Sequence, residues 1–120
     1  MDVENDCNLA VLRGPLSSVP EQRILESGTA VATLAVRTTL EGKATSVPVT
    51  VWDPPAWIAE LGEGDELVVL GAVRRRFYRS ASGTGSRVDV EATYVGRVTR
   101  RDRTTWRRRI DAAVAALDAD

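Results

Sequence analysis

Histidine is absent from this 120-residue chain, and cysteine occurs once, as Cys7. Without histidine the chain cannot form Ser-His-Asp or Cys-His catalytic arrangements, and it lacks the usual ligand sets of zinc and copper sites. A single cysteine can form no disulfide within the chain. The sequence therefore predicts no metal site, no cofactor and no enzymatic activity.

Long apolar runs are also missing. No segment approaches the ~20 apolar residues that a membrane-spanning helix needs. The N-terminal stretch MDVENDCNLAV is acidic, whereas a signal peptide would be basic. We therefore expect a cytoplasmic protein with no membrane partner.

Charge is divided unevenly along the chain, although the net charge is only -1. Residues 1–73 carry four basic and eleven acidic residues, whereas residues 74–109 carry twelve arginines and three acidic residues. The basic region contains the segment VRRRFYRSASGTGSRVDVEATY (73–94), in which arginines and aromatics flank a Gly/Ser-rich turn. This local charge, rather than the net charge, favours a polyanionic partner.

Alternating apolar residues and turn residues predict an all-β domain. The expected strands cover residues 8–14, 28–38, 44–52, 65–79 and 86–98. Prolines after Asp53, an expected N-cap, predict a short helix over 54–61, between the third and fourth strands. Five strands in this order match an OB-fold, a small Greek-key barrel that binds oligonucleotides or oligosaccharides. We assign residues 1–7 to an N-terminal tail, 8–99 to the OB-fold and 100–120 to a basic, amphipathic C-terminal helix.

Strand periodicity separates the aromatic residues by face. Val47, Val49 and Val51 share one side of the third strand, so Trp52 must lie on the other side and away from the core. The same period groups Arg74, Arg76 and Tyr78 on one face of the fourth strand, and it predicts that Phe77 packs into the core with the apolar row.

Several motifs resemble the bacterial single-stranded DNA-binding protein family. The segment NLAVLRGPLSSVPEQRILESGTAVATLAVRT is similar to the family's opening, and WIAELGEGDELVVLGAVRRR and SGTGSRVDVEATYV are similar to its helix, fourth strand and final hairpin. The resemblance covers about residues 8–98. It implies an OB-fold that binds single-stranded DNA without strong sequence preference and protects it during replication, repair or recombination in the bacterial nucleoid. It also implies a homo-oligomer, either a homotetramer or a dimer.

Basic residues and exposed rings together suit such binding, because cations attract phosphates while aromatic rings stack on any base. The residues expected to contact nucleic acid are Arg13, Arg37, Trp52, Arg74, Arg76, Tyr78, Arg79 and Arg87. Arg75 and Arg79 could instead be solvated, or pair with Asp89 and Glu91 across the hairpin.

The chain also departs from the family. Where the family has an exposed tryptophan and a basic residue, this chain has Ser46 and Pro48. The sequence ends at AALDAD without the family's long linker and acidic tip, so we expect no recruitment of replication proteins through a tail. Two alternatives to binding single-stranded DNA remain open: a divergent OB-fold module for protein interaction, and a binder of single-stranded RNA.

The C-terminal segment TTWRRRIDAAVAALDAD places Trp106, Ile110, Ala113, Val114 and Leu117 on one helical stripe. Its arginines lie in the first turns and its aspartates at the end, which opposes the helix macrodipole. The stripe predicts that this helix covers another surface. That surface could be the OB-fold, a neighbouring subunit or a charged partner.

Overall fold

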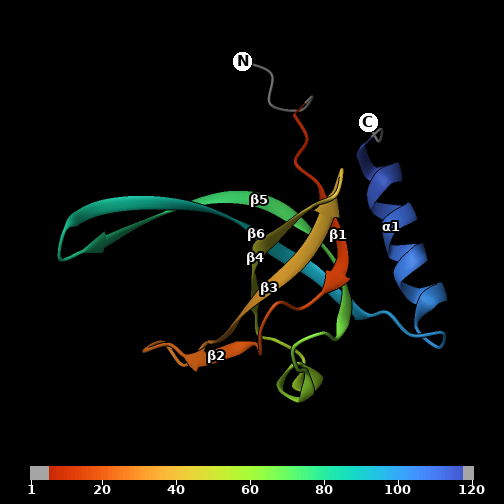
Figure 1. Cartoon of the computed structure of the whole chain (residues 1–120), viewed down its shortest axis with the longest axis horizontal. Coiled ribbons are helices and arrows are strands. Elements are labelled where there is room, and N and C mark those ends of the chain that lie inside the picture. The colour runs from red at the N-terminus through yellow and green to blue at the C-terminus, as the bar shows by residue number, and fades with distance from the viewer. Residues whose placement is uncertain (1–5, 118–120) are drawn as a thin grey trace.

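The computed structural model describes residues 6–117, which consist mostly of β-strands with one C-terminal helix (Figure 1). The elements are β1 (Ala10–Pro15), β2 (Glu21–Ile24), β3 (Ala30–Leu40), β4 (Lys43–Trp52), the 3-10 helix η2 (Ala56–Glu60), β5 (Glu66–Ser80), β6 (Gly83–Arg97) and α1 (Arg103–Leu117). All six strands belong to one sheet, in the order β1-β5-β6-β4-β3-β2. Every pair is antiparallel except β4 and β6, which are parallel.

The core lies on the inner face of this sheet. Alternate residues of the central strands point inward, as the two-residue period of a strand requires. They form one buried cluster that includes Leu34, Val36, Val49, Leu67 and Val69. Helix η2 adds the fully buried Ile58 to the same cluster, and Trp57 packs against it.

The sheet curls because the end of β1 returns to β3. Leu16 forms an isolated antiparallel bridge with Val36, and the Ser17 amide donates to the carbonyl of Ala35 at 2.8 Å. Gly14 makes this approach possible, because a Cβ at that position would collide with the backbone carbonyl of Arg37. The sheet therefore curves around the apolar core, with its inner face toward the core and its outer face toward solvent.

Strands β5 and β6 form a long hairpin that extends well beyond the core, as an arm reaching away from the rest of the molecule (Figure 1). A register shift occurs at Leu70/Gly71, and the arm leaves the body beyond Val73, whose partner Val90 still belongs to the buried core. At the start of the arm, the Asn8 side chain donates to the Val73 carbonyl at 2.8 Å and accepts from the Val73 amide at 2.9 Å. The Asn8 amide thus extends the hydrogen bonding between β1 and β5.

Three expectations from the sequence need correction. The expected five strands are six, because Glu21–Ile24, within a predicted loop, pairs with β3 as the short edge strand β2. The helix expected over 54–61 is a 3-10 helix with Pro55, not Asp53, at its N-cap. Phe77 is not a core residue, since 78% of it is exposed. Strand period gave the correct face for Phe77, but at that point the arm has already left the core.

Helix α1 stands beside β1 (Figure 1). It contacts the sheet through Trp106, beside Arg13, and through Arg109, whose guanidinium lies 5.2 Å from the ring centroid of Tyr94. Trp106 is buried, and Ile110 and Ala113 are of intermediate exposure, whereas Val114 and Leu117 are 49% and 45% exposed. The stripe predicted from the sequence is therefore more exposed in the second half of the helix. Residues 1–5 of the expected tail and residues 118–120 of the expected helix lie outside the described residues. No helix between residues 6 and 117 is long and apolar enough to cross a membrane.

Candidate nucleic-acid interface

Residues from three strands meet on the outer face of the sheet, at the base of the arm. In the β5–β6 register, Arg74 is opposite Asp89, Arg76 is opposite Arg87, and Ala72 is opposite Glu91. Opposed residues point to the same side of an antiparallel pair. Trp52, at the end of β4, reaches Glu91 from the neighbouring strand. We call this surface the strand face, and it comprises Trp52, Arg74, Arg76, Tyr78, Arg87, Asp89 and Glu91.

Trp52 is both exposed and fixed. Its ring remains 38% exposed, which confirms the prediction that it faces away from the core. The indole Nε1 donates a 2.7 Å hydrogen bond to Glu91 Oε1, and the guanidinium of Arg76 lies 5.7 Å from the ring centroid. A cation at that distance is attracted by the ring's quadrupole. These two contacts hold the indole in one orientation.

A buried carboxylate anchors Arg76. Asp89 is almost fully buried, and its Oδ2 accepts hydrogen bonds from Arg76 Nε at 2.8 Å and from the Thr50 hydroxyl at 2.6 Å. Asp89 Oδ1 and Arg76 Nη2 are buried without a hydrogen-bond partner among the described residues, although Arg76 Nη2 lies 4.0 Å from Glu91 Oε1. Because a buried charge is tolerated when it is paired and hydrogen-bonded, Arg76 and Thr50 are what keep Asp89 in this position.

Glu91 links the second arginine to the tryptophan. Arg74 Nη1 donates to Glu91 Oε2, while Trp52 uses the other carboxylate oxygen. The hydrogen bond from Arg74, reinforced by the one from Trp52, lowers the pKa of Glu91 although partial burial opposes the shift. The same pairing raises the pKa of Arg74. At neutral pH Glu91 is therefore ionised and offsets the charge of Arg74.

Tyr78 lies farther out on the arm. Half of its surface is exposed, and its ring lies across Gly85, where an added Cβ would be 2.7 Å from the ring and the hydroxyl oxygen. Glycine at this position thus leaves the space that the ring occupies. Trp52 and Tyr78 are the two exposed aromatic rings of the strand face.

Arg87 faces a separate depression between the arm and the edge of the sheet. This depression has a volume of about 300 Å³ and is also lined by Glu21, Gln22, Arg23 and Thr33. Arg23 belongs to β2, which the sequence did not predict. The charge at this end of the strand face therefore includes an arginine that was missed.

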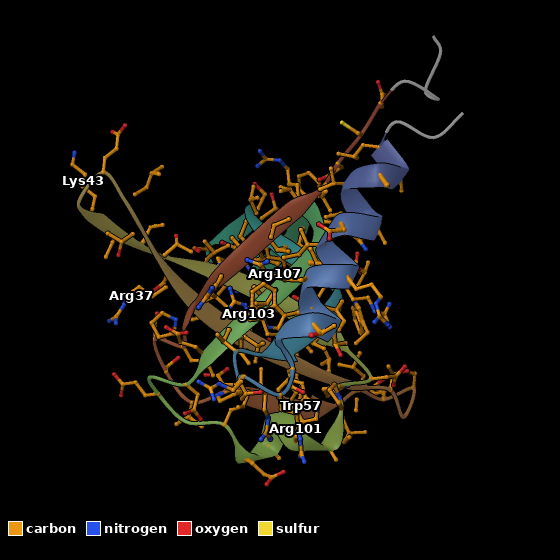
Figure 2. The ribbon with its side chains drawn as sticks, turned by 90° about the vertical axis from the view of Figure 1, so that its right-hand side faces the viewer. Arg37, Lys43, Trp57, Arg101, Arg103 and Arg107 are labelled. Atoms are coloured by element: carbon orange, nitrogen blue, oxygen red, sulfur yellow. The ribbon has the colours of Figure 1, made fainter. Side chains whose placement is uncertain are left out.

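The remaining predicted residues lie elsewhere. Arg37 is exposed on β3, opposite Ser46 and near the hairpin that contains Lys43 (Figure 2). Arg79 has the strand parity of Phe77, so it points to the other side of the arm. Arg13 lies on β1 and contacts the ring of Trp106 in α1, 5.5 Å from its centroid. These three arginines do not join the strand face.

Sequence reasoning also missed which acids hold the arginines. Asp89 and Glu91 were considered as partners of Arg75 and Arg79, but they bind Arg76 and Arg74 instead. The hairpin register contains the signal, because odd-numbered residues of β6 share a face with even-numbered residues of β5. Arg75 donates to the Ser86 hydroxyl on the opposite face.

Among residues 6–117, no group of three His, Cys, Asp or Glu residues is placed to hold a metal ion.

Comparison with solved structures identifies proteins of similar fold. A deletion mutant of the single-stranded DNA-binding protein from Thermus aquaticus matches with a TM-score of 0.66 and 28% sequence identity. The match covers 78% of this chain and 42% of that protein, so the present chain spans less than half of its length. No family model matches the chain, and no curated protein matches it. The chain is therefore similar in fold to a single-stranded DNA-binding protein.

Proposed function

We propose that residues 8–99 form an OB-fold that binds single-stranded DNA without strong sequence preference and without catalysing a reaction on it. Two findings support this proposal. The fold is similar to that of the Thermus aquaticus single-stranded DNA-binding protein, at 28% identity. The strand face combines exposed aromatic rings with arginines, which is the combination that sequence-tolerant binding uses.

Binding would rely on stacking more than on charge. Trp52 and Tyr78 offer ring faces to two bases, and each stacked base contributes about 1–3 kcal/mol. Arg74 and Arg76 are already bound to carboxylates, so their first role is to fix the geometry around Trp52. Arg87 and Arg23 have no carboxylate within 4.0 Å among residues 6–117, which leaves them able to contact phosphates.

The orientation of Trp52 is the observation that carries this proposal. An exposed tryptophan normally loses side-chain freedom when a ligand stacks on it, at a cost in binding free energy of about 0.5–1.5 kcal/mol. Here the hydrogen bond to Glu91 and the contact with Arg76 have already restricted the ring. A ring that is already restricted loses less side-chain freedom when a base stacks on it. The same restriction contributes nothing evident to the packing of the core.

A fluorescence titration with oligo-dT tests the proposal. We expect quenching that comes mainly from Trp52, because Trp106 is buried and Trp57 packs against the core. Trp52→Ala should remove most of the quench and weaken binding by about 1–3 kcal/mol, while circular dichroism shows a retained fold. Tyr78→Ala should weaken binding in the same direction.

Phe77→Ala is the matched control, because Phe77 is adjacent to Tyr78 and more exposed but points to the opposite face. It should leave oligo-dT affinity unchanged. If Phe77→Ala weakens binding and Trp52→Ala does not, the DNA would bind the other side of the arm. If a folded Trp52→Ala protein binds as tightly as the unchanged chain, the strand face is not the binding site.

One observation favours a protein-interaction module as the second candidate. Phe77, Val73 and Val88 lie on the side of the arm opposite the strand face, and each is exposed by 45% or more. Exposed apolar residues that gather on one surface are typical of contacts between proteins. Absence of any oligo-dT binding would favour this candidate, and tighter binding of a matched RNA would favour single-stranded RNA as the ligand.

We further propose that the chain acts in the bacterial cytoplasm as a homo-oligomer, a tetramer or a dimer. Several copies would then present their strand faces to one DNA strand and raise the effective affinity. Light scattering at micromolar concentration measures the assembly directly. A mass of about 13 kDa at all concentrations would identify a monomer and contradict this expectation.

A further inference from the structure

A second basic surface surrounds the turn that joins β6 to α1. A depression of about 280 Å³ lies there, and it contains no residue of the strand face. Its lining residues are Arg13, Val98, Thr99, Arg100, Arg103 and Trp106. Figure 2 shows Arg103 and Arg107 on the first turns of α1. Strand β1, the connecting turn and α1 thus each contribute an arginine to one hollow.

The arginines of this depression have fewer close carboxylate partners than Arg74 and Arg76 of the strand face have. No carboxylate among residues 6–117 lies within 4.0 Å of Arg100 or Arg103, and Arg13 has only a 3.9 Å contact with the half-exposed Glu66. The nearest acid in sequence, Asp102, instead accepts a 2.6 Å hydrogen bond from the Thr99 hydroxyl. Three guanidinium groups therefore line the hollow, and its two nearby acids, Glu66 and Asp102, both lie more than 4.0 Å from Arg100 and Arg103.

Trp106 supplies an independent indication of a ligand. The residue is only 6% exposed, yet its indole Nε1 has no hydrogen-bond acceptor among the described residues. A buried donor without an acceptor lowers the stability of a fold. Trp106 also lines the hollow, so the oxygens of a ligand bound there would lie beside both this residue and the three arginines.

We propose that this depression binds a phosphate group. Phosphate offers several charged oxygens to separate guanidinium groups and retains an acceptor for an indole N–H. Helix α1 begins at Arg103, so the positive end of its dipole lies at the same hollow. The phosphate can be a backbone phosphodiester of nucleic acid or a phosphate monoester, and neither source requires contact with Trp52.

Heteronuclear NMR of the full-length chain tests the site, because the three tryptophans give three indole N–H signals that substitutions can assign. Inorganic phosphate is titrated at constant ionic strength against chloride. We expect a saturating shift of the Trp106 signal. Arg103→Gln should weaken this binding about tenfold, as expected when a charged hydrogen bond is lost.

Arg108→Gln is the matched control, because it removes the same charge from α1 at a position about 200° around the helix from Trp106. It should leave the phosphate response unchanged. Equal losses in Arg103→Gln and Arg108→Gln would show a diffuse charge effect and overturn the proposal. Absence of any Trp106 shift with phosphate, with oligo-dT and with 5′-phosphorylated oligo-dT would also overturn it.

The two oligonucleotides identify the source of the phosphate. A Trp106 shift with oligo-dT that lacks a terminal phosphate assigns the site to the backbone, whereas a shift only with the 5′-phosphorylated form assigns it to a monoester. Trp52→Ala separates this site from the strand face, because that variant should keep the full response to inorganic phosphate. Failure of the strand face as a DNA site would therefore leave this result unaffected.

Discussion

Two groups of arginines differ in how much of their charge is available. On the strand face, Arg74 and Arg76 are hydrogen-bonded to Glu91 and Asp89. Around the start of α1, Arg100 and Arg103 have no acidic partner among residues 6–117. Arginine density in a sequence therefore does not measure the charge that a ligand meets. What matters is whether the fold has already placed a carboxylate beside each guanidinium.

The difference assigns the two groups different physical tasks. A guanidinium bound to a buried carboxylate is fixed in space, and it can orient a neighbouring ring such as Trp52. An unpaired guanidinium in solvent retains its full attraction for phosphate and releases counterions when it binds. The strand face is thus organised for geometry, and the surface around α1 is organised for charge.

The largest expected effect concerns the buried pair that organises the strand face. Asp89→Asn leaves Arg76 beside a neutral amide in a largely buried position, so the free energy of unfolding should fall by about 3 kcal/mol. Urea denaturation measures this change. Asp111→Asn, on the exposed side of α1, is the control and should alter stability by less than about 0.5 kcal/mol. Equal stability of the two variants would mean that the buried pair does not organise the strand face.

The salt dependence of oligo-dT binding compares the two arginine groups directly. If the α1 surface contacts the DNA backbone, replacing Arg100 and Arg103 by glutamine should reduce the slope of log K against log salt by about 1.4, at about 0.7 for each phosphate contact. Replacing Arg74 and Arg76 should change the slope by less than half as much, because both are already paired. A reversed order would show that DNA displaces the carboxylates of the strand face.

The smallest expected effect concerns acid stability. Because the folded protein lowers the pKa of Glu91, the contribution of Glu91 to stability is present above its unfolded pKa of about 4.5 and is lost as pH falls through the folded value. Glu91→Gln should therefore lose less stability between pH 6 and pH 3 than the unchanged chain does. Arg74→Gln removes the main cause of the shift and should reduce the acid dependence in the same way. An acid dependence unchanged in both variants would contradict this account of Glu91.

Local patterns in the sequence identified most of the sheet and the face of Trp52. Alternation of Val47, Val49 and Val51 placed the tryptophan outward, because side chains of a strand point to opposite sides at every step. The same rule failed for Phe77 in a specific way. Periodicity reports the side of a strand but not how far the protein body extends along it, and β5 continues beyond the core.

Contacts between segments that are far apart in the sequence were harder to predict from it. The four residues of β2 (Glu21–Ile24) are all exposed and include three polar side chains, so they carry no alternation to identify an edge strand. The depression beside α1 depends on how β1 lies relative to the C-terminal helix, which no local pattern encodes. The sequence nevertheless contained one usable signal for the ion pairs, since the β5–β6 turn fixes which residues share a face.

The reversed charge order of α1 has a consequence for its dynamics. Arg103 lies in the first turn, where no acidic residue offsets it, so the helix dipole opposes its charge by about 0.3–1 kcal/mol. The helix is attached to the sheet through Trp106 and through Arg109 beside the Tyr94 ring, while Val114 and Leu117 are 49% and 45% exposed. Such a helix can open locally while the sheet stays intact. We expect the amides in the second half of α1 to exchange with deuterium before those of β3 and β5, with a rate that measures how firmly the rest of the molecule holds this helix.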